Sequence, residues 1–203
     1  MNCPPPELRV ARLGATDRLV GLTPFALLDA VTGDPPRLST SVRVGVRDGD
    51  LLVRFDGRDA GTVATMTRRD EPLWKEDVFE VFLSPLPEPT VYYEFEVNPL
   101  GALFDARVTS LEGRRDTMSA EVVWNCQGFG ARVRLRPGRW SALLTIPLRP
   151  MDPEGKALLW RANFYRIDRG ERDEYSAWCP TLRSPPDFHV PSRFGWLRLA
   201  PVS

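Results

Sequence analysis

Residues 41–55 read SVRVGVRDGDLLVRF, and this stretch decides the fold class. Apolar residues recur at every second position on both sides of Asp48-Gly49. Such alternation is typical of β-strands that bury one face. Glycine reaches the positive φ that a two-residue hairpin turn requires. The stretch therefore predicts two antiparallel strands, over residues 42–46 and 51–55, joined by a tight turn.

The same pattern continues along the chain. Alternation or a short apolar run predicts further strands over residues 78–83, 93–97, 104–108, 131–135, 140–146, 160–164 and 196–199. The 20 prolines, which helix interiors and central strands exclude, indicate many loops between short elements. No stretch has a convincing helical period, and only a short turn is expected near residues 150–156. We therefore expect an all-β fold, an antiparallel β-sandwich of jelly-roll or immunoglobulin-like two-sheet type.

The size of the chain fits one domain. It has 203 residues, of which 42% are hydrophobic, and all-β sandwiches reach this length without dividing. We expect a single domain over residues 1–203 that is a monomer. Its best-supported part spans residues 41–199, and residues 1–25 are expected to form a lead-in strand and loop.

Charge and hydropathy exclude several classes of partner. With 27 basic and 27 acidic residues the net charge is zero, so no positive field would attract nucleic acid or an anionic membrane. No run of 18 apolar residues could form a transmembrane helix. The first residues, MNCPPP, do not resemble a signal peptide, so we expect a cytoplasmic location, or an extracellular or periplasmic one if a leader was removed. Three cysteines, Cys3, Cys126 and Cys179, give no disulfide framework and no CxxC metal pair.

The densest cluster of chemically active side chains is in residues 72–83, PLWKEDVFEVFL. Trp74 precedes a predicted strand, and Glu76, Asp77 and Glu80 follow it. Carboxylates accept hydrogen bonds from hydroxyl groups, and a flat aromatic ring covers the apolar face of a pyranose. The combination favours a recognition surface over a reaction centre, although a charged surface strand end is the simpler interpretation.

A second candidate segment is the proline-rich loop of residues 175–195, which holds several aromatic residues and the single histidine, His189. Long loops without secondary structure are usually functional. A Ser–His nucleophile would need an orienting acid and an exposed serine, and nothing local supplies them. His189 with Met66 or Met118 could serve as axial haem ligands.

Taken together, these segments resemble carbohydrate-binding module family 9 and its wider relatives, the DOMON-like sugar and haem domains. The resemblance covers roughly residues 41–199. It rests on the order and spacing of these pieces: the hairpin of residues 42–55, Trp74…Asp77…Glu80 with its Val81-Phe82-Leu83 tail, Phe95-Glu96-Val97-Asn98, Trp160…Asn163, the Trp178 loop and the closing stretch 191–199.

The resemblance implies a β-sandwich that clamps the end of a sugar between two aromatic rings. Trp74 matches the first ring, Phe188 falls at the second, and Trp178 matches a nearby tryptophan. Glu80 matches a carboxylate that binds the sugar. Two positions depart from the family, because Glu96 replaces an arginine and Pro185 falls near an asparagine.

The resulting ligand set for a mono- or oligosaccharide is Trp74, Glu80, Phe188, Trp178, Glu96 and Asn163, with no catalytic residue. Structural Ca²⁺ is also implied by the resemblance, with loop aspartates such as Asp56, Asp59 and Asp70 as ligands.

Three alternatives stay open beside a non-catalytic carbohydrate-binding module. A degenerate sandwich could bind another small ligand or a protein. A DOMON-like domain could bind haem. A glycoside hydrolase would need two carboxylates about 5–10 Å apart across a cleft. Glu76, Asp77 and Glu80 could supply such a pair, but as neighbours on one short strand they fit a surface better.

Overall fold

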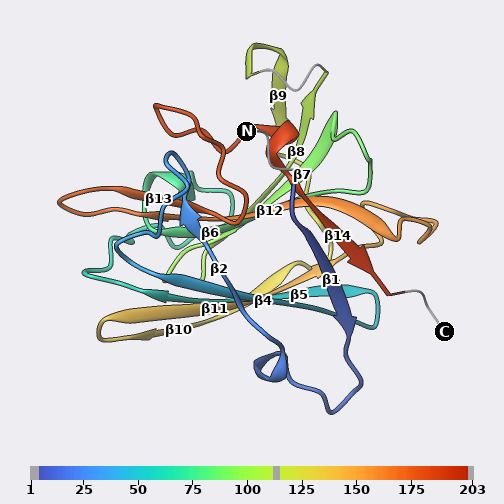
Figure 1. Cartoon of the computed structure of the whole chain (residues 1–203), viewed down its shortest axis with the longest axis horizontal. Coiled ribbons are helices and arrows are strands. Elements are labelled where there is room, and N and C mark those ends of the chain that lie inside the picture. The colour runs from blue at the N-terminus through green and yellow to red at the C-terminus, as the bar shows by residue number, and fades with distance from the viewer. Residues whose placement is uncertain (1–4, 112–114, 201–203) are drawn as a thin grey trace.

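Two stacked β-sheets form the protein in the computed structural model, which describes residues 5–111 and 115–200 (Figure 1). Sheet B contains, in spatial order, β10 (Gly130–Arg136), β11 (Arg139–Pro147), β5 (Asp50–Arg58) and β4 (Thr40–Arg47), and the short β2 (Phe25–Ala26) pairs with β4. Sheet A contains β14 (Gly195–Leu199), β12 (Leu159–Asp168), β6 (Val78–Ser84), β7 (Val91–Val97), β8 (Leu103–Ser110) and β9 (Met118–Glu121). β13 (Glu174–Ala177) pairs with β12 and with β3 (Leu28–Asp29). The predicted β-sandwich is confirmed.

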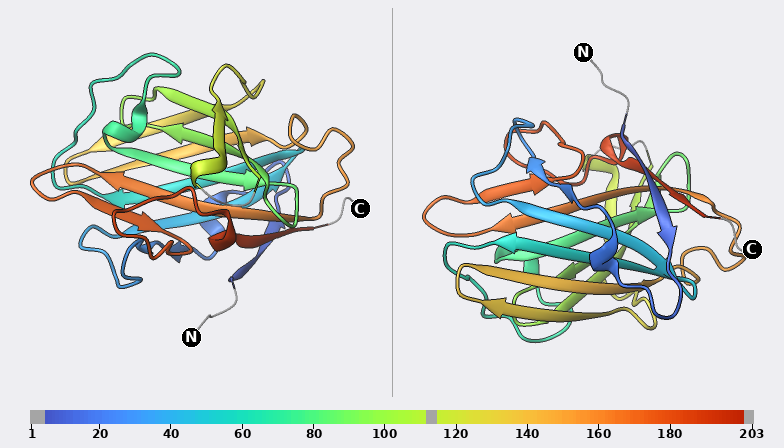
Figure 2. Two further views of the ribbon diagram at one scale, coloured as in Figure 1. Left: turned by 90° about the horizontal axis from the view of Figure 1, so that it is seen from above. Right: turned by 60° about the horizontal axis from the view of Figure 1, so that its bottom comes forward.

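The lead-in strand has a role that its sequence does not reveal. β1 (Glu7–Arg12) pairs in parallel with β14 through residues 7–10 and with β4 through residues 11–12. β1 therefore joins the edges of the two sheets, and it lies beside β14 in both drawings (Figures 1 and 2). All other strand pairs among the described residues are antiparallel, as expected.

The hairpin of residues 42–55 forms as predicted. Asp48 and Gly49 both have positive φ, 52° and 89°, and Arg47 pairs with Asp50 across the turn. Two consecutive positive φ values match the right-handed twist of the strands that they connect. This register places the alternating apolar residues of β4 and β5 on one face.

The predicted strands are all present, with boundaries that differ by a few residues. The strands missed in the sequence are short: β2, β3, β9 and β13 have two to four residues each. Residues near 150–156 form turns, and the helices of the described chain are 3₁₀ segments: η1 (Leu19–Gly21), η2 (Leu73–Lys75), η3 (Arg115–Thr117) and η4 (Pro191–Arg193). No described helix is long and apolar enough to span a membrane.

The main hydrophobic core lies between the sheets. Phe79 of sheet A stacks on Trp140 and Phe55 of sheet B, with ring centroids 3.7 Å and 4.6 Å apart. All three side chains are fully buried. Burial of each such side chain stabilises the fold by about 1.5–3 kcal/mol.

A second apolar layer covers the outer face of sheet A. It includes Phe82, Tyr92, Phe104, Tyr165, Phe188 and Phe194. Every residue of β6 is buried, so both faces of this strand are covered. That double burial explains why residues 78–83 form an apolar run with only one charge, Glu80, within it. The candidate site is built on this outer face.

Candidate functional site

The floor of the candidate site is a row of residues across sheet A. The register pairs Tyr165 on β12 with Glu80 on β6, Glu80 with Glu96 on β7, and Glu96 with Phe104 on β8. Side chains two residues apart on a strand point to the same face. Glu94 therefore joins Glu80 and Glu96 on the outer face, and strand register brings three glutamates together.

These three glutamates are buried and short of partners. Glu80, Glu94 and Glu96 are 2%, 6% and 0% exposed. One carboxylate oxygen of each lies within 4.8 Å of the others. Oε1 of Glu80 and both carboxylate oxygens of Glu96 accept no hydrogen bond. The centre of sheet A therefore holds buried carboxylate oxygens to which no described residue donates a hydrogen bond.

Burial raises the pKa of all three carboxyl groups. It raises the pKa of Glu94 to about 7, although the side chain of Glu96 and, to a smaller extent, the charge of Arg115 act in the opposite direction. Burial and the neighbouring carboxylates also raise the pKa of Glu80 and of Glu96 well above the usual value. The backbone N–H of Trp74 opposes this rise in the pKa of Glu96, although it is not close enough or well enough aligned to form a hydrogen bond with the carboxylate. Without a ligand, the cluster therefore retains protons at neutral pH.

A cavity of about 380 Å³ opens above the glutamates. Its lining includes Trp74, Glu80, Glu94, Phe104, Tyr175 and Phe188. Trp74, on η2, is 40% exposed and its ring meets Phe104 edge to face at 5.2 Å. Phe188 is only 7% exposed because it stacks on Tyr165 at 4.1 Å. Trp74, Phe188 and Glu80 are thus brought together, and Glu96 lies beside Glu80 beneath the cavity.

Arg169 holds two walls of the cavity in place, and Arg161 anchors the end of the proline-rich loop of residues 175–195 (the aromatic loop). Arg169 donates from Nη2 to the Trp74 carbonyl oxygen at 2.7 Å and from Nη1 to the Tyr175 hydroxyl at 2.5 Å. Arg161 donates from Nη2 to the Phe194 carbonyl oxygen at 2.5 Å, at the end of the aromatic loop. The sequence interpretation missed both arginines, because their partners are backbone atoms and distant side chains that no local motif marks.

Two predicted ligand-binding residues lie elsewhere. Trp178 packs in the main core against Phe25 and Phe164, at 5.4 Å and 5.6 Å, and is not part of the cavity lining. Asn163 is fully buried, and its Nδ2 donates to the Tyr165 hydroxyl and to the Cys179 carbonyl oxygen while its Oδ1 accepts from the Cys179 N–H. Both residues anchor the aromatic loop, because their side chains face protein atoms and not the cavity.

His189 is a neutral wall residue of the cavity. Its Nδ1 lies 2.7 Å from the Tyr92 hydroxyl, and burial lowers its pKa to about 4. The same hydroxyl lies 3.5 Å from the sulfur of Met118. His189 and Met118 therefore approach one hydroxyl together, which is not the arrangement of two axial ligands on opposite faces of a haem.

A family model for carbohydrate-binding family 9 matches residues 35–199. The chain belongs to carbohydrate-binding family 9. No curated protein matches the chain.

Solved structures share the fold of this family 9 chain. A candidate carbohydrate-binding protein from Bacteroides uniformis ATCC 8492 is 20% identical with a TM-score of 0.76, and the match covers 97% of this chain and 100% of that one. A family 9 module from Caldicellulosiruptor kristjanssonii in complex with glucose is 12% identical with a TM-score of 0.66, covering 97% of each chain. The cellotriose complex from that organism is 13% identical with a TM-score of 0.68, covering 97% and 95%.

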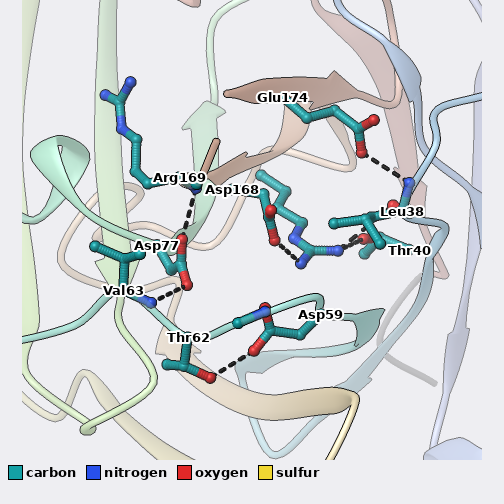
Figure 3. Close-up of polar contacts among 12 residues, drawn as sticks. Leu38, Thr40, Asp59, Thr62, Val63, Asp77, Asp168, Arg169 and Glu174 are labelled. Atoms are coloured by element: carbon teal, nitrogen blue, oxygen red, sulfur yellow. Dashed lines mark hydrogen bonds and ion pairs between the residues drawn. The ribbon is translucent and has the colours of Figure 1, made fainter. Parts of the chain in front are cut away.

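A second acidic cluster of the family 9 domain is not part of the cavity lining, and Figure 3 shows its polar contacts. Asp59, Asp77 and Asp168 are buried, and one carboxylate oxygen of each lies within 4.8 Å of the others. Asp77 accepts hydrogen bonds from the N–H groups of Val63 and Arg169, both at 2.7 Å. Burial raises the pKa of Asp77, and it raises that of Asp168 to about 6.

The expected calcium ligands only partly match this cluster. Asp59 belongs to it, but Asp56 pairs with Arg54, whose Nη2 lies 2.6 Å from Asp56 Oδ1. Asp70 occupies a turn position with φ 63° and lies 3.8 Å from Arg69. Asp77 and Asp168 complete the cluster beside Asp59, since the start of β6 and the end of β12 meet there.

Proposed function

We propose that this family 9 domain is a non-catalytic carbohydrate-binding module that holds the end of a saccharide between Trp74 and Phe188. The observation that carries the proposal is the cavity itself, which combines a half-exposed tryptophan with buried carboxylates. Solved relatives of the same fold contain glucose and cellotriose, which supports a saccharide ligand.

Each side of the cavity suits one part of a sugar. The Trp74 ring is free to stack on the apolar C–H face of a pyranose, since 40% of the residue is exposed. Glu80 and Glu94 line the cavity as acceptors for hydroxyl groups. A volume of about 380 Å³ is near the lower end of small-molecule sites, which favours the end of a chain over a long segment.

The arrangement of the carboxylates supports binding without catalysis. A glycosidase needs two carboxyl groups on either side of the scissile bond, about 5–10 Å apart. Glu80, Glu94 and Glu96 all project from the same face of neighbouring strands, and their oxygens approach within 4.8 Å. All three carboxylates lie together on one side of the cavity, so they would not flank a bound sugar.

We also propose that Asp59, Asp77 and Asp168 hold a structural Ca²⁺. Calcium takes six to eight oxygen ligands, and carboxylate oxygens within 4.8 Å of one another can share one ion. Arg166 already neutralises part of the charge through its ion pair with Asp168. A bound ion would neutralise the rest and connect the loop after β5 to the start of β6 and the end of β12.

Isothermal titration calorimetry with glucose and cellotriose tests the saccharide site. Trp74→Ala is expected to weaken binding by more than tenfold, as for removal of an aromatic hot spot. The control is Leu135→Ala on β10, because Leu135 is similarly exposed, at 49%, and lies on the other sheet. Equal affinity of the Trp74 variant and the wild type would contradict the proposal.

A further inference from the structure

We propose that the cavity selects a sugar that carries a protonated primary amine, and that the ammonium group binds to the Glu80, Glu94 and Glu96 cluster. This inference rests on the proposed saccharide function and specifies its ligand class as amino sugars.

Among the described residues, no basic side chain forms a hydrogen bond or an ion pair with the three glutamates. The two arginines that line the cavity are engaged elsewhere: Arg169 contacts Asp173, Tyr175 and the Trp74 carbonyl oxygen, and Arg115 lies 3.3 Å from Asp187. His189 is neutral, because burial lowers its pKa to about 4. The charges of Arg169 and Arg115 lower the pKa of Glu80 and of Glu94, but neither arginine forms an ion pair with a carboxylate of the cluster.

The open acceptor of Glu80, which lines the cavity, suits a donor of an ammonium group. Oε1 of Glu80 and both carboxylate oxygens of Glu96 are buried without a hydrogen-bond partner. An ammonium group offers three donors and one positive charge. Glu80 and Glu94 line the cavity and would contact it directly, while Glu96 adds its negative charge from behind. A neutral sugar would supply hydroxyl donors but no positive charge, so the glutamates would have to keep their protons to stay neutral.

The rest of the lining favours an organic cation over a metal ion. Calcium would require six to eight oxygen ligands. Beyond the carboxylates, the cavity presents the aromatic side chains of Trp74, Phe104, Tyr175 and Phe188. Aromatic faces attract an ammonium group and also stack on the sugar ring that bears it. The lining thus combines carboxylates, which suit an ammonium group, with aromatic rings, which suit the sugar ring that carries it.

An ammonium ligand also fits the titration of the site. The groups that face the cluster are Glu80 from β6, Glu94, Glu96 and Tyr92 from β7, Tyr165 from β12, and Arg115, Arg169, Asp187 and His189 from the surrounding segments. Burial raises the pKa of both tyrosines, so they stay neutral. The glutamates are therefore the groups that exchange a proton for the ligand cation.

Calorimetric titration of the wild-type protein at about pH 6.5 tests the inference, with glucosamine, N-acetylglucosamine and glucose, and with their β-1,4-linked dimers. We expect the amine to bind at least tenfold more tightly than either neutral sugar, which corresponds to about 1.4 kcal/mol. In Glu96→Gln the ratio of amine to neutral affinity should fall at least fivefold. The control Glu88→Gln, at an exposed residue of the β6–β7 loop, should keep the wild-type ratio.

The outcomes separate this inference from the proposed function. If the neutral sugars bind as tightly as the amines, the saccharide site stands and the amine selectivity is wrong. If no sugar of either kind binds, both proposals fail. If Ca²⁺ competes with glucosamine in proportion to its concentration, the glutamates hold a metal ion and the inference is overturned.

Discussion

Replacement of Glu94 by glutamine should make the ligand-free protein more stable at alkaline pH. The carboxyl group has an ordinary pKa of 4.5, and burial in the folded state raises it to about 7. At about 1.4 kcal/mol per pKa unit, the ionised form costs the folded state about 3 kcal/mol. Glutamine has nearly the same shape and no charge, so Glu94→Gln should recover about 1–3 kcal/mol of unfolding free energy.

The pH dependence follows from the direction of the pKa change. Between about pH 4.5 and pH 7 the folded protein retains a proton on Glu94 that the unfolded chain has lost. The unfolding free energy of the wild type therefore falls as pH rises through this window. Below it both states are protonated, so Glu94→Gln and the wild type should differ little near pH 4.5 and most above pH 7.

Urea denaturation at about pH 5 and about pH 8 measures this difference. A domain of this size gains about 2–4 °C in Tm for each kcal/mol, so a thermal melt should show the same trend. Glu88→Gln is the matched control, because it removes the same charge from an exposed loop. The reasoning is refuted if the stability gap between Glu94→Gln and the wild type is the same at both pH values.

Three further changes test other parts of the structure. Trp74→Ala should cost about 1 kcal/mol of stability, because the residue is 40% exposed, whereas Phe188→Ala, at 7% exposed, should cost about 3–5 kcal/mol; similar losses in denaturation would contradict the assigned burial. Added Ca²⁺ should raise the Tm and chelator should lower it, and Asp77→Asn should abolish both changes; a Tm that ignores calcium in the wild type argues against the site. Gly195→Ala should destabilise by about 1–3 kcal/mol in urea, because a Cβ atom there would lie 2.4 Å from the Trp178 ring; an unchanged midpoint would show that the ring can move.

Much of the candidate site was accessible from the sequence, because its first parts are local. Trp74 and Glu80 stand close together before and within one strand, and both line the cavity. Glu94 was missed, although its two-residue spacing from Glu96 was visible. What made it part of the site was the pairing of β7 with β6, which the sequence of either strand alone does not specify.

Trp178 and Asn163 show the opposite case. Trp178 is an aromatic residue in a proline-rich loop, which is typical of a binding wall, yet its ring closes the main core against Phe25. Asn163 has the chemistry to bind hydroxyl groups, but the folded loop uses its donors and its acceptor. Whether a polar group is free for a ligand depends on which backbone atoms pack against it.

The sequence by itself determined the strands of the sandwich and the Asp48-Gly49 turn, because alternation every two residues and positive φ are properties of neighbouring residues. Only the tertiary structure decided that β1 joins the two sheets, that Asp77 and Asp168 meet Asp59, and that three glutamates share one floor. Each of these depends on strand register and loop closure between segments far apart in the chain. Such pairings are set by the burial of the whole core, which no single stretch of sequence contains.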